Sequence, residues 1–147
     1  MDVDAVRATV DDVIAAMFAT DPGVGRFPRG DWPHGGCEFT TVAIAAVLED
    51  RGLGRWTFVS AGLSGEVNHA WLEWRNEDGE VIFSIDATLH QFDGWDAPFA
   101  QEGVTPAASM FSPVQYAGEM WDWPWLGDER QIFRRLIRAV REQLASS

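Results

Sequence analysis

The chain contains a single cysteine, Cys37, whose surroundings suit a nucleophile. It follows His34-Gly35-Gly36 and opens a segment whose apolar residues predict a helix. At a helix N-terminus, the dipole and the free backbone N–H groups are expected to lower the pKa of the thiol, and the same N–H groups stabilise an oxyanion. The two glycines let a substrate approach the backbone closely. Cys37 is therefore the candidate nucleophile, although free cysteines are more often buried and inert.

A second candidate pair, His69 and Asp86, comes from a predicted β-hairpin. Segments 68–75 and 80–86 flank Asn76-Glu77-Asp78-Gly79, which is a strong turn signal. A turn centred between Glu77 and Asp78 places His69 directly opposite Asp86, on one face of the hairpin. A carboxylate beside an imidazole fixes the tautomer, which is the orienting role in acyl-transfer enzymes. Taken alone, such a pair is more often structural than catalytic.

The same register gathers the apolar residues of both strands on the other face of the hairpin. These are Ala70, Leu72 and Trp74, opposite Ile85, Phe83 and Val81. Slipping the register by one residue would put Asp86 on this apolar face, so the sequence is expected to specify the register well.

Hydrophobic periodicity indicates the elements that must position these residues. We expect helices over about 3–19, from about 37 to a stop at Gly52, and over 129–144. We expect strands over 55–63, 68–75 and 80–86, and an irregular segment over 87–127 with a possible strand near 111–116. Asp128 is the expected N-cap of the last helix. The order of helix, helix, antiparallel sheet and helix indicates an α+β fold, and residues 1–147 are expected to form one domain.

The composition argues against several classes of partner. The formal net charge of -12 disfavours a nucleic-acid phosphate backbone or an anionic membrane as the main partner. Met1-Asp2-Val3-Asp4 lacks the features of a signal peptide, and no apolar run reaches transmembrane length. A cytoplasmic location is therefore expected, and export without a cleaved signal stays open. Nothing in the sequence decides the oligomeric state.

A zinc site is the competing reading of the candidate residues. His34, Cys37, His69 and Asp86 could supply four ligands. The chain has no second cysteine and no Cys-x-x-Cys motif, so this reading ranks below a nucleophile. We accordingly expect no metal and no cofactor.

Tryptophans cluster near the end of the chain, in Trp121-Asp122-Trp123-Pro124-Trp125. These rings could form a rim that docks a protein substrate, or a loop that buries them over the sheet, and the second reading is favoured. Trp71 and Trp95 allow the same two readings. The arginine-rich last helix is expected to present a solvated face.

The order of a cysteine heading a helix, a histidine on a strand and an aspartate on the next strand resembles papain-like and transglutaminase-like cysteine enzymes. Segment 35–41 resembles their nucleophile helix, and Asn68-His69-Ala70-Trp71 resembles the "HAW" strand of transglutaminase-like proteins. Segment 85–88, followed by Gln91-Phe92, is similar to a segment of small bacterial members, some of which are papain-fold toxin domains that deamidate glutamine. The resemblance covers roughly residues 27–92.

This resemblance implies a catalytic triad. Cys37 would be the nucleophile, His69 the base and acid, Asp86 the orienting group, and Gln91 a supporting polar residue. The implied reaction is attack on an amide of a protein or peptide substrate through a thioester. Water as the second substrate gives deamidation or proteolysis, and an amine gives cross-linking. A silent binding module of the same fold and a small-molecule amine acyltransferase stay open as alternatives.

The resemblance leaves the second oxyanion donor open. Papain-like proteases carry a glutamine shortly before the cysteine, and this chain has none there. Trp32 and His34 are candidates for that donor, and Gly36 and Trp71 are further candidates for contact with the substrate or oxyanion.

Overall fold

The computed structural model describes residues 1–21, 24, 30, 32–33, 36–63, 67–124, 126–127 and 129–146. These residues form an α+β fold, as predicted. The α-helices are α1 (Val3–Ala19), α2 (Cys37–Asp50) and α3 (Glu129–Ser146). The strands are β1 (Thr57–Leu63), β2 (Val67–Arg75), β3 (Val81–Asp86), β4 (Phe99–Glu102) and β5 (Val114–Gly118). They form one antiparallel sheet in the order β4-β3-β2-β1-β5.

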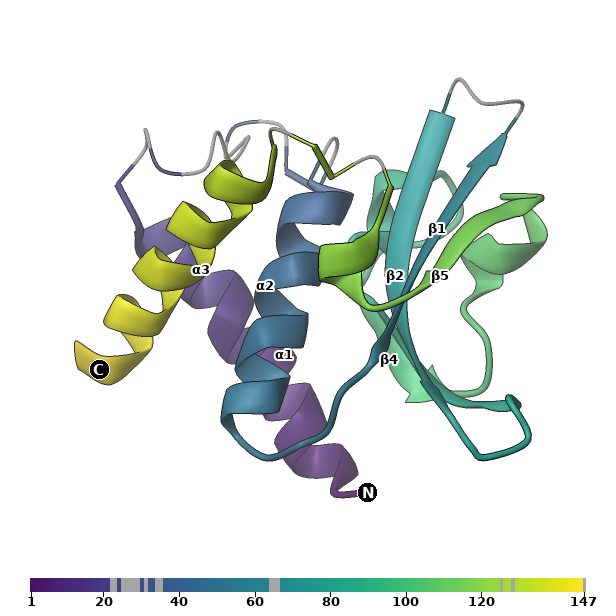
Figure 1. Cartoon of the computed structure of the whole chain (residues 1–147), viewed down its shortest axis with the longest axis horizontal. Helices are drawn as coiled ribbons and strands as arrows, with labels where there is room; N and C mark the ends of the chain where they lie inside the picture. The colour runs from purple at the N-terminus through teal and green to yellow at the C-terminus, as the bar shows by residue number, and fades with distance from the viewer. Residues whose placement is uncertain are drawn as a thin grey trace.

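Helix α2 is the central element of the fold (Figure 1). It contacts β1 and β2 of the sheet and also packs against α1 and α3. A helix that is apolar on most sides has to be covered on most sides, which explains this position. Its buried apolar residues include Val42, Ala43, Ile44, Val47 and Leu48.

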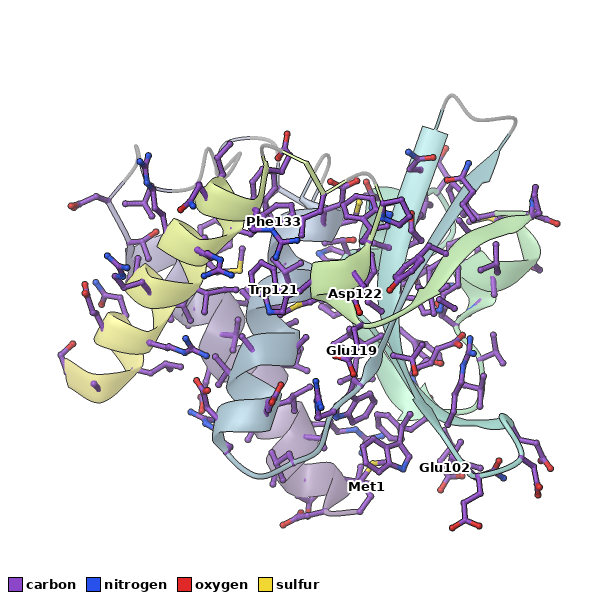
Figure 2. The ribbon with its side chains drawn as sticks, viewed as in Figure 1. Met1, Glu102, Glu119, Trp121, Asp122 and Phe133 are labelled. Carbon is purple, nitrogen blue, oxygen red and sulfur yellow. The ribbon has the colours of Figure 1, made fainter. Side chains whose placement is uncertain are left out.

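The outer helices cover α2 with amphipathic faces. α1 begins after Asp2, whose carboxylate accepts a hydrogen bond from the backbone N–H of Ala5 (3.0 Å) and so caps the helix. α3 buries Phe133, Leu136, Ile137 and Val140. Figure 2 shows Phe133 on this buried side of α3, toward α2. The expected cap Asp128 lies outside the described residues. No helix in the described part of the chain is both long and apolar enough to cross a membrane.

The register between β2 and β3 differs from the predicted one by two residues. Leu72 pairs with Ile85, and Trp74 pairs with Phe83. The predicted register, with Leu72 opposite Phe83, is therefore wrong. His69 is not directly opposite Asp86.

The turn between β2 and β3 and a β-bulge next to it together account for the shift, with one residue from each. The backbone N–H of Asn76 donates to the carbonyl of Glu80 (3.0 Å), which closes a longer turn in which Gly79 has a φ of 83°. The pairing shifts again beyond Trp74, leaving Ile82 as the extra residue of a β-bulge. A shift of two residues preserves the face of each side chain, so the predicted faces are retained for His69, Trp71 and Asp86.

The segment predicted to be irregular contains two strands. β5 lies close to the possible strand near 111–116 and pairs with β1. The edge strand β4, which pairs with β3 so that Asp86 meets Phe99, was not predicted. β4 has four residues and lacks a clear apolar alternation, so its sequence carries little strand signal.

The face of the sheet that points away from the helices is covered by a second apolar cluster. Side chains of β1 and β2 meet side chains of the segment that links β3 to β5. The buried members are Val59, Ala61, Trp71, Leu89, Ala107 and Phe111. This layer buries the side chain of His69, which lies against the rings of Trp71 and Phe111.

Candidate active site

His69 and Asp86 form a fully buried hydrogen-bonded pair. Nε2 of His69 lies 2.8 Å from Oδ1 and 2.9 Å from Oδ2 of Asp86, and both residues have 0% relative exposure. The pair forms although the two residues are diagonal in the sheet, because a diagonal neighbour on the same face stays within reach of an imidazole. The structure therefore brings together two of the three residues of the expected triad.

The second ring nitrogen of His69 contacts Gln91. Nε2 of Gln91 lies 3.2 Å from Nδ1 of His69 and donates a second hydrogen bond to Oγ1 of Thr88 (3.1 Å). A carboxylate only accepts, so Nε2 of His69 carries the proton that faces Asp86, and Nδ1 of the neutral ring accepts from the Gln91 amide. The imidazole thus holds its basic lone pair on Nδ1, and Gln91 covers that lone pair. Gln91 contacts the histidine, as expected of a supporting polar residue.

Thr105 completes the chain of polar groups and was missed by the sequence analysis. Its hydroxyl donates to Oδ2 of Asp86 (2.8 Å), and the residue is 2% exposed. Thr105 also accepts from the backbone N–H of Ala107 (3.3 Å), at the start of the 3₁₀ turn η3 (Pro106–Ser109). Two donors therefore hold the Asp86 carboxylate, which offsets the cost of burying its charge.

Replacing Thr105 by valine is expected to lower the free energy of unfolding by about 1–3 kcal/mol, because a buried carboxylate loses a charge-assisted hydrogen bond. Urea unfolding of Thr105→Val and Thr105→Ser measures this effect, since serine keeps the hydroxyl. Equal stability of Thr105→Val and the wild type would show that the hydrogen bond contributes nothing.

Cys37 approaches the sheet beside His69. The thiol receives hydrogen bonds from the backbone N–H groups of Ala70 and Glu38. The hydroxyl of Thr41, one turn further along α2, donates to the carbonyl of Ala70 (3.3 Å). The observed pairing between β2 and β3 starts only at Leu72. Cys37 and Thr41 of α2 therefore bond to the backbone of Ala70, at a point where β3 no longer pairs with β2. Ala70 follows His69 directly in the sequence.

The described residues show no hydrogen bond between the thiol of Cys37 and the ring of His69. α2 packs on the sheet face that carries Ala70, whereas the ring of His69 belongs to the opposite face. The thiol meets the backbone of β2 at Ala70 and is close enough for the Asp86 carboxylate to raise its pKa. Joining the thiol to Nδ1 requires that Gln91 give up its hydrogen bond to that nitrogen.

Burial raises the pKa of the Cys37 thiol to about 12. The charges of Glu38 and Asp86 raise it further, while the N–H groups of Ala70 and Glu38 act in the opposite direction. The expectation of a lowered pKa at the helix N-terminus is therefore wrong. It assumed an accessible thiol, whereas Cys37 is only 8% exposed and desolvation outweighs the helix dipole.

This raised pKa predicts a loss of stability at alkaline pH. Between the ordinary thiol value of 9.0 and about 12, the unfolded chain releases the Cys37 proton while the folded chain keeps it. The free energy of unfolding should therefore fall by about 1.4 kcal/mol per pH unit above pH 9. Cys37→Ser, which carries no titrating thiol, should lack this contribution. Urea unfolding of both proteins from pH 8 to pH 11 tests it, and parallel curves would contradict it.

The other expected site residues occupy structural positions. Nε1 of Trp32 donates to Thr40 (3.1 Å), and Nε1 of Trp71 donates to the buried Glu73 (2.9 Å). Neither indole N–H is free to serve as an oxyanion donor, and Trp71, at 1% exposure, cannot form a docking rim.

Gly36 precedes α2, and its backbone N–H already donates to Pro33 (3.1 Å). A Cβ atom there would meet Trp32 at 2.7 Å, so glycine is needed for packing. His34 lies outside the described residues. The N-cap residue Gly36 has no side chain to cap α2, so the backbone N–H of Cys37 is the candidate oxyanion donor.

Comparisons of the chain with protein family models, curated proteins and solved structures found no match. A functional reading therefore depends on the residues and the geometry of the site.

Proposed function

We propose that the protein is a cysteine-dependent amide hydrolase or acyltransferase with a papain-like or transglutaminase-like core. The supporting observation is a buried chain of hydrogen bonds that runs from Thr105 through Asp86 and His69 to Gln91. This chain leaves the basic lone pair of His69 on Nδ1, while the thiol of Cys37 contacts the adjacent residue Ala70. Nucleophilic catalysis needs a base held in one tautomer and a thiol that can reach it, and here the thiol lies at the backbone of the residue next to that base.

In the proposed reaction, Nδ1 of His69 takes the proton of the Cys37 thiol as the sulfur attacks the carbonyl carbon of an amide. The oxyanion forms beside the first turn of α2, where backbone N–H groups stabilise it. His69 then gives the proton to the leaving nitrogen, and a thioester with ammonia or an amine results. Water, deprotonated by His69, cleaves the thioester to the acid and regenerates the thiol.

Gln91 must move in this proposal, because its side chain occupies the nitrogen that takes the proton. It lies in a single 3₁₀ turn, η2 (Leu89–Gln91), which is held by few backbone hydrogen bonds. Next to it, the ring of His90 lies 5.0 Å from that of Trp32, which links η2 to the segment before α2. Entry of a substrate between these two segments would separate Gln91 from His69 and open the way to Cys37.

The high pKa and the burial of Cys37 favour a second candidate, a catalytically silent binding module. In that case Gln91 would be a permanent partner of His69, and the polar chain would only stabilise the sheet. The two candidates differ in the fate of an amide substrate.

Blocked peptides that contain glutamine, incubated with the protein, test the proposal. Mass spectrometry separates conversion of the amide to the acid from cleavage of the peptide, and added methylamine reveals transfer to an amine. We expect one of these products with the wild type and none with Cys37→Ser. Product with both proteins would exclude Cys37 as the nucleophile, and absence of product together with an unmodified thiol would favour the binding module.

A further inference from the structure

Three arginines of α3 have neither an ion pair nor a hydrogen bond within the described part of the chain. The chain contains 23 acidic and 11 basic residues, so a nearby carboxylate is the usual expectation for each arginine. Arg134, Arg135 and Arg138 form neither an ion pair nor a hydrogen bond with any described residue. The arginines with carboxylate partners are Arg51, Arg55, Arg75 and Arg141.

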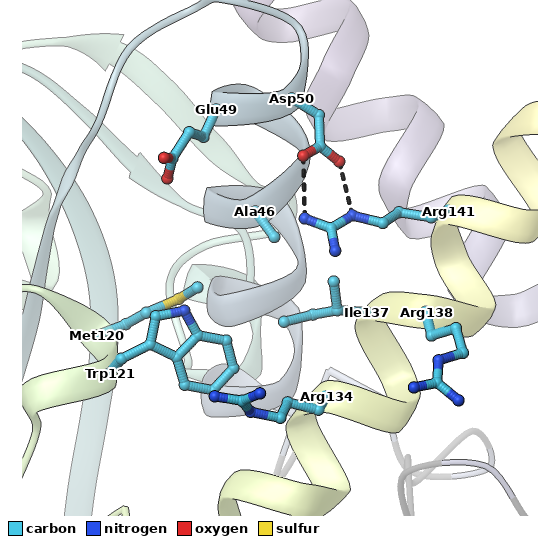
Figure 3. Close-up of a pocket in the computed structure, with 9 residues that line it drawn as sticks. All are labelled: Ala46, Glu49, Asp50, Met120, Trp121, Arg134, Ile137, Arg138 and Arg141. Atoms are coloured by element: carbon cyan, nitrogen blue, oxygen red, sulfur yellow. Dashed lines mark hydrogen bonds and ion pairs between the residues drawn. The ribbon is translucent and has the colours of Figure 1, made fainter.

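Two of the unpaired arginines line a groove between α2, α3 and the 3₁₀ turn η4 (Met120–Asp122), shown in Figure 3. The groove has a volume of about 480 Å³. Its polar side is formed by Arg134 and Arg138. Its apolar side chains are Ala46, Met120, Trp121 and Ile137.

The acidic side chains of the groove are already engaged. Asp50 accepts two hydrogen bonds from Arg141 (2.7 and 2.9 Å), as the dashed lines in Figure 3 mark. Glu49 lies 3.8 Å from Arg55. The charges of Arg134 and Arg138 therefore stay uncompensated within the groove.

The geometry of the two free arginines favours an external anion. They are four residues apart on α3 and so lie side by side, where like charges repel. The guanidinium of Arg134 lies over the ring of Trp121 (5.3 Å to the centroid), which limits its freedom before a ligand arrives. Apolar neighbours also lower the local dielectric, which strengthens attraction to a carboxylate.

We propose that this groove binds an acidic segment of a partner protein. Carboxylates of the segment would pair with Arg134 and Arg138, and an apolar side chain between them would pack against Trp121. A lone anion such as phosphate would bind the guanidinium groups but would leave the apolar side chains of the groove exposed to water. Because the groove has both charged and apolar side chains, it favours a peptide that carries both kinds of group. This inference does not depend on the reaction proposed for Cys37.

The test uses a fluorescein-labelled peptide of alternating glutamate and leucine, with a glutamine-for-glutamate peptide as its control. Fluorescence anisotropy should show binding of the acidic peptide with a Kd below about 1 mM, which weakens as salt is added. Arg134→Gln and Arg138→Gln should each raise the Kd about tenfold. Arg135→Gln, on the same helix but outside this groove, is the matched control and should change the Kd less than about twofold.

Three results would overturn the proposal. One is no binding of the acidic peptide below about 1 mM. Another is equal binding of the acidic and the control peptide, or a loss of affinity in Arg135→Gln as large as in Arg134→Gln and Arg138→Gln. The third is inorganic phosphate binding more tightly than the peptide through Arg134 and Arg138, which would make the groove a phosphate site. All four proteins should give the same circular dichroism spectrum, because the substituted side chains are exposed.

Discussion

Cys37→Ser is expected to reduce turnover of an amide substrate by about 10⁴-fold or more, while the fold is retained. The serine hydroxyl is a far weaker nucleophile than a thiol at the same position. The hydroxyl can still accept the hydrogen bonds that Ala70 and Glu38 donate to the thiol. Steady-state kinetics on the peptides described above, together with thermal unfolding, measure both parts of the expectation.

Cys37→Ala provides the control for this first prediction. It removes the acceptor as well as the nucleophile, so it should abolish turnover equally but lose stability relative to Cys37→Ser. Turnover that survives in both variants would contradict the role of Cys37. If Cys37→Ser kept most of the turnover and only the less stable Cys37→Ala lost it, the role of Cys37 as the nucleophile would be contradicted as well.

Asp86→Asn is expected to lower turnover by about 10³–10⁴-fold, because it disturbs the tautomer of His69. The carboxylate accepts from both His69 and Thr105. An asparagine has one acceptor oxygen and places an NH₂ group where the second acceptor was. His69 would then carry its proton on Nδ1, where it faces the NH₂ of Gln91 and can no longer take a proton from the thiol.

The same substitution should cost about 1–3 kcal/mol of stability, since a buried donor is left without an acceptor. Thr105→Val is the matched control. It removes the other hydrogen bond of the carboxylate but leaves the tautomer of His69 in place. We expect Thr105→Val to resemble Asp86→Asn in stability but to retain far more turnover. Similar turnover in the two variants would show that the tautomer of His69 does not matter.

Much of the fold could be predicted because its signals are local. α1 and the start of α2 follow from helical spacing and from the residues that flank each helix. The turn at Asn76-Glu77-Asp78-Gly79 correctly located the hairpin. Its register could not be predicted, because the bulge at Ile82 depends on how β3 fits between β2 and β4. The faces of His69, Trp71 and Asp86 were still correct, since the error at these residues was an even number, whereas Val81 pairs with Arg75 and not with Trp74 as predicted.

The candidate site was predictable only in part. The pairing of His69 with Asp86 followed from their shared face. Thr105 lies 19 residues beyond Asp86, in a segment without regular spacing, so no pattern connected the two. The pKa of Cys37 was predicted in the wrong direction because burial, unlike a helix start, is a property of the whole fold.

The most direct test of the central claim compares the rate at which Cys37 forms a thioester with the glutamine peptide at pH 7.5 in the wild type and in His69→Gln, followed by mass spectrometry, because Gln91 covers Nδ1 of His69 until a substrate enters. Glutamine keeps a donor for Asp86 but offers no base to the thiol. If His69 deprotonates Cys37, the wild type should react at least about 100-fold faster than the variant, with similar unfolding curves for the two proteins. Equal rates in two equally folded proteins would show that Cys37 and His69 do not act together.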